Sequence, residues 1–122
     1  MEAIAKIESE AVKIAEFLEE HKCSGTVVLD VRPMCGWTSF FVITTVRSQA
    51  HLQALVGNLD QYLREISVFS LHGKRARHEK GWALIDCGEL IVHLMEKEQR
   101  EFYELERLWF RSPVIYQSSK SS

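Results

Sequence analysis

The sequence has little cysteine, and its cysteines form no pattern. Cys23, Cys35 and Cys87 include no CxxC pair and have no spaced pair of histidines beside them. This spacing indicates neither a disulfide framework nor a structural zinc site. We therefore predict a protein of a reducing compartment, the cytoplasm.

Long uncharged apolar runs and an excess of one charge are also lacking. No uncharged stretch approaches the length of a membrane span, and the opening MEAIAKIESE carries acidic residues where a signal peptide needs a positive segment. The 15 basic and 17 acidic side chains give a formal charge of -2, which does not favour a surface built throughout to bind phosphate backbone. We predict a protein that has no membrane partner.

The familiar catalytic motifs are missing too. The chain contains no GxxxxGKS/T or GxGxxG loop, no GxSxG elbow and no HExxH helix, which excludes the common routes to nucleotide or peptide chemistry. Asp30 and Asp86 are candidates for a carboxylate pair that binds magnesium for nucleotidyl transfer. The sequence lacks the glycine-serine loop with a DxD pattern that would position them. We expect no enzyme, no cofactor and no metal site, and a magnesium-dependent nucleotidyltransferase is the alternative hypothesis.

What the sequence does contain is typical of one globular domain. Its 122 residues, 46% hydrophobic and 26% charged, suffice for one core and are too few for two ordinary domains. Apolar residues at steps of three and four predict helices, and β-branched runs predict strands. The expected elements are helices at 2–21 and 48–66, strands at 26–31, 40–45 and 68–71, and a polar loop at 72–81. The alternation favours an α/β fold with a mixed sheet of about five strands and flanking helices.

The domain is expected to cover residues 1–111. Residues 112–122 end in the polar, low-complexity run QSSKSS, which has little to bury. We predict that residues 112–122 form a disordered tail.

The stretch from Trp82 to Trp109 combines two strands, a tight turn and a helix. If Gly88-Glu89 is a two-residue type II′ loop, the pairing of the two strands is fixed, although a longer turn would exchange their faces. One face then carries Ala83, Ile85, Cys87, Leu90, Val92 and Leu94, all apolar or small. The other face carries Trp82, Leu84, Asp86, Ile91, His93 and Met95.

The second face has the composition of a recognition surface. Trp82 and Met95 are candidate anchors for a partner, and Asp86 and His93 are candidate sources of directional hydrogen bonds. The alternative is that a further helix or the tail covers this face, so that Asp86 and His93 are satisfied internally. Cys87 is predicted to be buried and unreactive beside the turn.

The closing helix presents an apolar stripe and one aromatic residue beside it. Phe102, Leu105 and Trp109 have helical spacing, which predicts that they pack in the core. Tyr103 lies off that stripe, so its hydroxyl is expected to reach solvent or a partner.

One basic run lies in the predicted polar loop at 72–81. It contains Lys74, Arg75, Arg77 and Lys80 against a single acid, Glu79. A solvated loop is the simpler interpretation. The alternative is a peripheral contact with RNA phosphates through Lys74, Arg75 and Arg77.

Several of these segments together resemble one known family, the ribosomal silencing factors, RsfS or Iojap-like. The similarity is carried by Gly81-Trp82, Asp86-Cys87-Gly88-Glu89, Ile91-Val92-His93-Leu94-Met95 and the closing helix from Glu98 to Trp109. Weaker similarity extends through Leu29-Asp30-Val31, Phe40-Phe41-Val42-Ile43 and Ser48. The chain departs from the family pattern at Ser39 (usually aspartate), Val46 (usually glycine) and His72 (usually glutamate).

The resemblance implies a non-enzymatic, nucleotidyltransferase-like fold that binds the large ribosomal subunit through its ribosomal protein fourteen. Occupying that surface would block joining of the small subunit and repress translation, while organellar relatives take part in large-subunit assembly. Our main hypothesis is such a repressor, docking through Trp82, Leu84, Asp86, His93, Met95 and Tyr103. A homodimer through the apolar hairpin face is a further hypothesis.

Overall fold

The computed structural model describes residues 2–68, 77–79, 81–104, 107 and 111–118, which build one α/β domain. In chain order the elements are α1 (Glu2–Glu20), β1 (Ser24–Asp30), β2 (Phe40–Val46), α2 (Gln49–Glu65), β3 (Arg77–Glu79), β4 (Trp82–Asp86), β5 (Leu90–Glu96), α3 (Lys97–Tyr103) and β6 (Val114–Gln117). The strands form one sheet in the order β3-β4-β5-β2-β1-β6. The β2–β5 pair is parallel and the other neighbours are antiparallel, so the predicted mixed sheet is confirmed.

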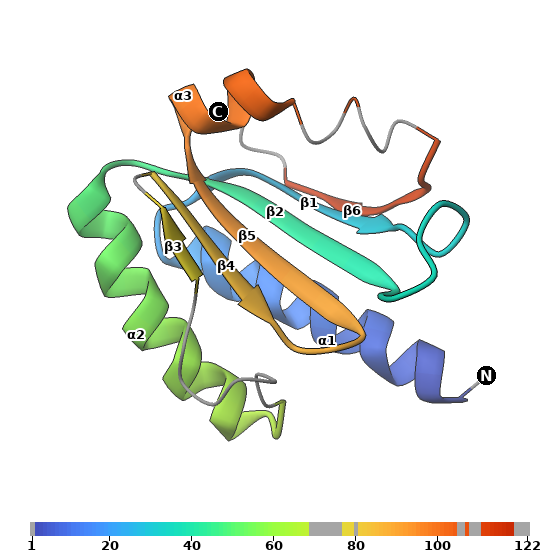
Figure 1. The fold of residues 1–122 in the computed structure, drawn as a ribbon. Coiled ribbons are helices and arrows are strands. Elements are labelled where there is room, and N and C mark those ends of the chain that lie inside the picture. Colours follow the sequence, from blue (N-terminus) through green and yellow to red (C-terminus); the bar gives the residue numbers. More distant parts are fainter. Residues whose placement is uncertain (1, 69–76, 80, 105–106, 108–110, 119–122) are drawn as a thin grey trace.

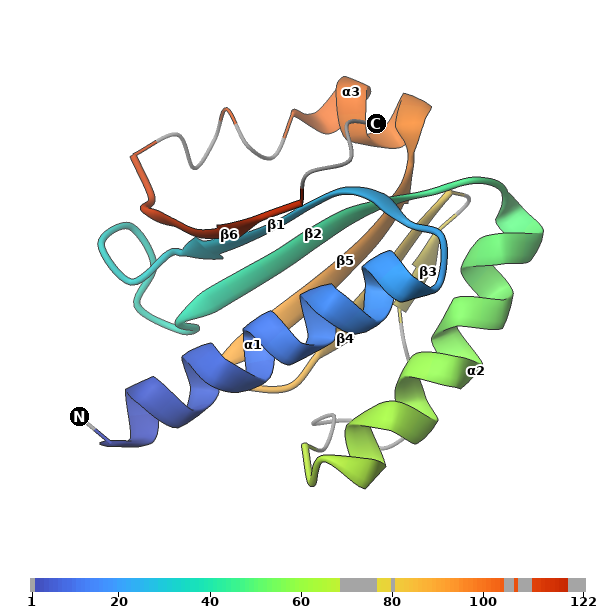
Figure 2. The same cartoon turned by 180° about the vertical axis from the view of Figure 1, so that it is seen from behind.

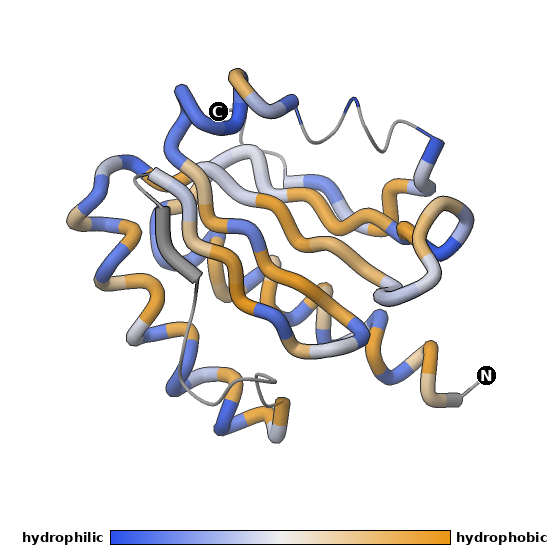
Figure 3. The backbone as a smooth tube through the Cα atoms, viewed as in Figure 1, coloured by the Kyte–Doolittle hydropathy of each residue, from blue (hydrophilic) through white to orange (hydrophobic). Residues whose placement is uncertain are grey.

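The sheet separates two apolar clusters. Helices α1 and α2 cover one side, whereas α3 lies on the other (Figures 1 and 2). Along α1 and α2 apolar and polar residues alternate with the helical period, and the central strands are almost continuously apolar (Figure 3). Among the described residues, no helix is both long and apolar enough to cross a bilayer.

The two long helices confirm the predictions from apolar periodicity. Buried Leu52, Leu55, Leu59 and Leu63 form the inward stripe of α2. Ser48 caps the same helix, because its hydroxyl accepts a hydrogen bond from the His51 amide at 3.1 Å. Sequence periodicity and the cap together therefore define α2.

Both edge strands lie where the sequence predicted none. Arg77–Glu79 forms β3 inside the predicted polar loop and pairs with β4. Val114–Gln117 forms β6 and pairs with β1, so the prediction of a disordered tail is wrong for these residues. Backbone pairing with an existing strand orders each of these short segments. The strand expected at 68–71 lies largely outside the described residues, and Val68 itself is not in a strand.

Helix α3 is shorter than the predicted closing helix. It ends at Tyr103, because Glu104 adopts a left-handed conformation with φ of 48°. Phe102 is 78% exposed, so its assignment to a core stripe is wrong. Leu105 and Trp109, the other members of that stripe, lie outside the described residues.

Candidate functional site

The hairpin of β4 and β5 has the predicted register. Trp82 pairs with Met95 and Asp86 with Ile91. Gly88 has φ of +86°, a conformation that favours glycine, which confirms the tight turn after β4. The Asp86 carboxylate also accepts a hydrogen bond from the Gly88 amide at 2.9 Å, so one oxygen of this candidate recognition group stabilises the turn.

The two hairpin faces are divided as predicted. Five residues of the apolar face lie in the cluster beneath α1 and α2: Ala83, Ile85, Leu90, Val92 and Leu94. Cys87 is only partly buried against that cluster. The opposite face joins a second cluster of Val27, Leu29, Val31, Phe41, Ile43, Ile91 and Met95.

Met95 is not an exposed anchor. Its side chain is 0% exposed and belongs to the second cluster. The reason is its position on β5, which has a strand on each side and contacts α3. Met95 therefore supports the surface from beneath, and the prediction that it anchors a partner is wrong.

Trp82, His93 and Tyr103 form the centre of the candidate surface. The Trp82 indole N–H donates to Nδ1 of His93 at 3.3 Å, and the Trp82 ring centroid lies 4.7 Å from that of Tyr103. Trp82 is half-buried, as are Leu84 and Asp86 beside it, while Tyr103 is 39% exposed. These four side chains form the accessible part of the surface, which we name the docking rim: Trp82, Leu84, Asp86 and Tyr103.

His93 lies beneath the docking rim as a neutral imidazole. It is 4% exposed, and burial lowers its pKa to about 4. Because Nδ1 accepts from Trp82, the proton of the neutral ring resides on Nε2. This buried Nε2 donor has no hydrogen-bond acceptor among the described residues.

A glycine and an arginine hold α3 against the sheet next to Trp82. Gly81 has φ of +78°, and a Cβ there would lie 2.8 Å from Cγ of Gln99. Its amide also donates to Oε1 of Gln49, the first residue of α2, at 3.1 Å, so Gly81 contacts both helices. The Arg100 guanidinium donates to Oγ1 of Thr45 on β2 at 2.8 Å. Sequence reasoning missed these positioning contacts because they join residues that lie far apart in the chain.

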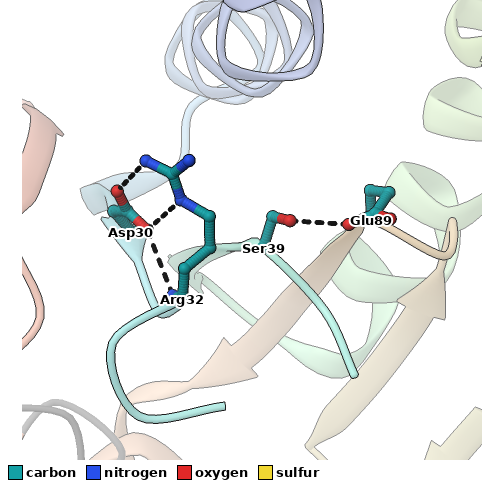
Figure 4. A network of polar contacts seen from close by, with 4 residues as sticks. All are labelled: Asp30, Arg32, Ser39 and Glu89. Atoms are coloured by element: carbon teal, nitrogen blue, oxygen red, sulfur yellow. Dashed lines mark hydrogen bonds and ion pairs between the residues drawn. The ribbon is translucent and has the colours of Figure 1, made fainter. Parts of the chain in front are cut away.

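The β4–β5 turn is joined to the loop between β1 and β2. The Ser39 hydroxyl donates to the Glu89 carboxylate at 2.6 Å (Figure 4), and the Thr38 hydroxyl donates to the carbonyl of Gly88 at 2.9 Å. An aspartate at position 39, which the family resemblance led us to expect, would place a second carboxylate beside Glu89. The departure at Val46 gives a buried strand residue, and His72 lies outside the described residues.

The carboxylates of the nucleotidyltransferase alternative do not converge. Asp30 accepts three hydrogen bonds from Arg32, including one from Nη2 at 2.6 Å, and these bonds lower its pKa (Figure 4). The register aligns Asp30 with Phe40 and Leu90 but Asp86 with Ile91 and Phe41, which places the two acids on opposite faces. They are also three strand spacings apart, roughly 14 Å. This arrangement does not provide the pair that a shared magnesium site requires.

Two of the three thiols are poor nucleophiles, and the described residues contain no group of metal ligands. Burial raises the pKa of the Cys87 thiol to about 12 and that of Cys23 to about 11, which disfavours the reactive thiolate. Within the described part of the chain, no three metal-ligating side chains are grouped. Of the predicted RNA contacts, Lys74 and Arg75 lie outside the described residues, and Arg77 is part of β3.

Comparison with known proteins adds to this geometry. Residues 4–122 match the family described as "Ribosomal silencing factor during starvation". Ribosomal silencing factor RsfS of Treponema pallidum is 34% identical over 103 residues, which cover 81% of this chain and 88% of that protein. The mouse protein named "Mitochondrial assembly of ribosomal large subunit protein 1" is 33% identical over 79% of this chain, but only 43% of the mouse protein is covered. A crystal structure of a Chromobacterium violaceum protein superimposes with a TM-score of 0.74 at 27% identity, covering 84% of this chain and 85% of that one.

Proposed function

The chain belongs to the family of ribosomal silencing factors, and from this we propose that it represses translation by binding the large ribosomal subunit. We propose further that it binds through ribosomal protein fourteen of that subunit and sterically blocks joining of the small subunit. This function requires a docking surface and no catalytic step. The family is not an enzyme class, in keeping with the carboxylates that fail to converge.

The docking rim is the observation that supports this proposal. Trp82 and Tyr103 present two contacting rings at the surface, with Leu84 and Asp86 beside Trp82 on β4. Tryptophan and tyrosine dominate the binding energy of many protein interfaces, because they bury much area with few rotatable bonds. His93 and Met95 lie beneath the rim and hold its shape.

Co-sedimentation of the purified chain with purified large subunits tests the proposal. The wild type is expected in the subunit pellet at moderate salt, and the double variant Trp82→Ala/Tyr103→Ala is expected to bind at least about ten-fold more weakly. Gln53→Ala, on an exposed position of α2, is a control that should bind like the wild type. A wild type that stays in the supernatant contradicts the proposal.

A peripheral contact with ribosomal RNA through Lys74, Arg75 and Arg77 is a separable part of the proposal. Three phosphate contacts would make the binding constant fall with rising salt, with a slope of roughly -2 to -3. Replacing all three residues with glutamine should reduce that slope. An unchanged slope would contradict the RNA contact but not the proposed contact with ribosomal protein fourteen.

A role in assembly of the large subunit is the second candidate, favoured by the name of the mouse relative. The two functions predict different ribosome profiles. A repressor of joining, added to purified mature subunits, lowers the fraction of complete ribosomes. An assembly factor leaves mature subunits unaffected, and its loss from cells causes precursors of the large subunit to accumulate.

A further inference from the structure

A row of aromatic rings leads from the docking rim across the sheet to the loop between β1 and β2. Tyr103 contacts Trp82, whose ring centroid lies 5.9 Å from that of His93. The His93 ring lies 4.8 Å from Phe41 on β2, which in turn lies 6.5 Å from Trp37. Phe41 and His93 are buried, so the row reaches the surface at the docking rim and again at Trp37.

Trp37 is the far end of this row, and it is 67% exposed. Exposed Met34 belongs to the same loop, and the hydroxyl of Ser112 contacts Sδ of Met34 at 3.8 Å. The loop and α3 lie at opposite ends of the sheet (Figures 1 and 2). An indole in this position stabilises the fold little, because most of its surface remains in water.

The loop that carries Trp37 is anchored at both ends. On one side, Arg32 binds Asp30 and its guanidinium lies 5.6 Å from the centre of the Phe40 ring. On the other side, Ser39 is hydrogen-bonded to Glu89 of the β4–β5 turn (Figure 4), and Thr38 is hydrogen-bonded to Gly88 of the same turn. A side chain presented by an anchored loop loses less conformational entropy when it binds, which raises its contribution to affinity.

We propose that Trp37 is a second anchor for the same protein that docks on the rim. This inference rests on the proposed function and extends its surface to the β1–β2 loop. Successive ring centroids along the row are 4.7 to 6.5 Å apart, so its two ends lie no more than about 22 Å apart, and one interface of ordinary size covers both. A protein fits this end, because the two exposed side chains of the loop, Trp37 and Met34, are both apolar.

Equilibrium binding of the full chain, labelled at its N-terminus, to purified large subunits tests this inference. Trp37→Ala is expected to weaken binding about ten-fold, and Trp37→Phe to retain most of the affinity. The melting temperature of Trp37→Ala should match the wild type, since the indole is mostly exposed. Gln53→Ala is again the matched control on the helical side of the protein.

The outcomes separate this inference from the proposed function. If Trp82→Ala weakens binding but Trp37→Ala does not, the proposed function stands and the second anchor is refuted. If the wild type does not bind, both fail. The measurement is repeated with purified ribosomal protein fourteen and with protein-free ribosomal RNA. A Trp37-dependent affinity for the RNA alone, or a Trp37-dependent dimer in sedimentation velocity, would also overturn the assignment.

Discussion

The two faces of the sheet bury their side chains in different ways. On the face beneath α1 and α2, the hairpin buries only apolar side chains, such as that of Leu94. The opposite face also buries Met95, yet it places the imidazole of His93 beside it and leaves Trp82 half-buried. A buried N–H without an acceptor among the described residues costs free energy that an apolar side chain would avoid. The composition of the second face is therefore not explained by stability alone.

The largest expected effect comes from deleting an apolar group on the helix-covered face. Leu94→Ala should lower the free energy of unfolding by about 3 kcal/mol, because the leucine is fully buried between the sheet and the helices. Leu84→Ala, on the docking rim, should cost about 1 kcal/mol or less, since Leu84 is only partly buried. Urea denaturation measures both values. Equal losses would mean that the second face is as closed as the first.

The pH dependence of stability is the second expected difference between the two faces, because only one of them buries a histidine. The pKa of His93 is about 4 in the folded chain and near its ordinary 6.5 in the unfolded chain, so only the unfolded state takes up the proton between these values. The free energy of unfolding is highest above pH 6.5 and decreases as the pH is lowered toward 4. Protonation of His93 in the unfolded chain accounts for a decrease of about 3 kcal/mol.

Denaturation of the wild type and of His93→Gln at pH 7 and pH 4.5 isolates this contribution. The glutamine cannot titrate, so acid should destabilise the variant less than it destabilises the wild type. Carboxylates such as Asp30 titrate in both proteins and cancel in the difference. Identical pH dependence in the two proteins would show that His93 is not held neutral by burial.

The sequence predicted the parts of the fold that depend on local pattern. The helical period defined α1 and α2, and period-two alternation with Gly88 in a tight turn defined the hairpin register. The two edge strands escaped prediction because β3 and β6 are three and four residues long, and backbone pairing orders them.

The sequence predicted which residues belong to the candidate site better than it predicted how exposed each of them is. Which side chains share a face follows from the register, so Trp82 and His93 were grouped correctly. Burial depends on what packs above the face, and sequence spacing does not report that. Met95 and His93 are therefore more deeply buried than expected, and Trp37, far away in sequence, joins the same row of rings.

Two glycines provide a smaller contrast between the faces. Gly81→Ala should lower the free energy of unfolding by about 1–2 kcal/mol, because φ is +78° and the new Cβ would lie 2.8 Å from Cγ of Gln99. Gly57→Ala should raise it by up to about 1 kcal/mol, because that position lies within α2 and a Cβ meets nothing within 4 Å.

Thermal denaturation of both variants checks the signs, and large-subunit binding adds a second readout. Gly81 precedes Trp82 and lies against α3, so Gly81→Ala should also weaken binding by displacing the docking rim. Gly57→Ala should leave binding unchanged. A stabilising Gly81→Ala would show that α3 does not require the close approach seen in the structure.

A small change in stability is expected at the contact between the β1–β2 loop and the β4–β5 turn. Ser39→Ala removes the hydroxyl that donates to Glu89 and should cost about 1 kcal/mol, because the exposed Glu89 carboxylate regains water. Ser39→Asp should cost more, since it places a second carboxylate beside Glu89. If this contact positions Trp37, both variants will weaken large-subunit binding by more than their loss of stability explains. The additional loss of affinity should disappear when the same substitutions are made in Trp37→Ala, because the positioned side chain is then absent.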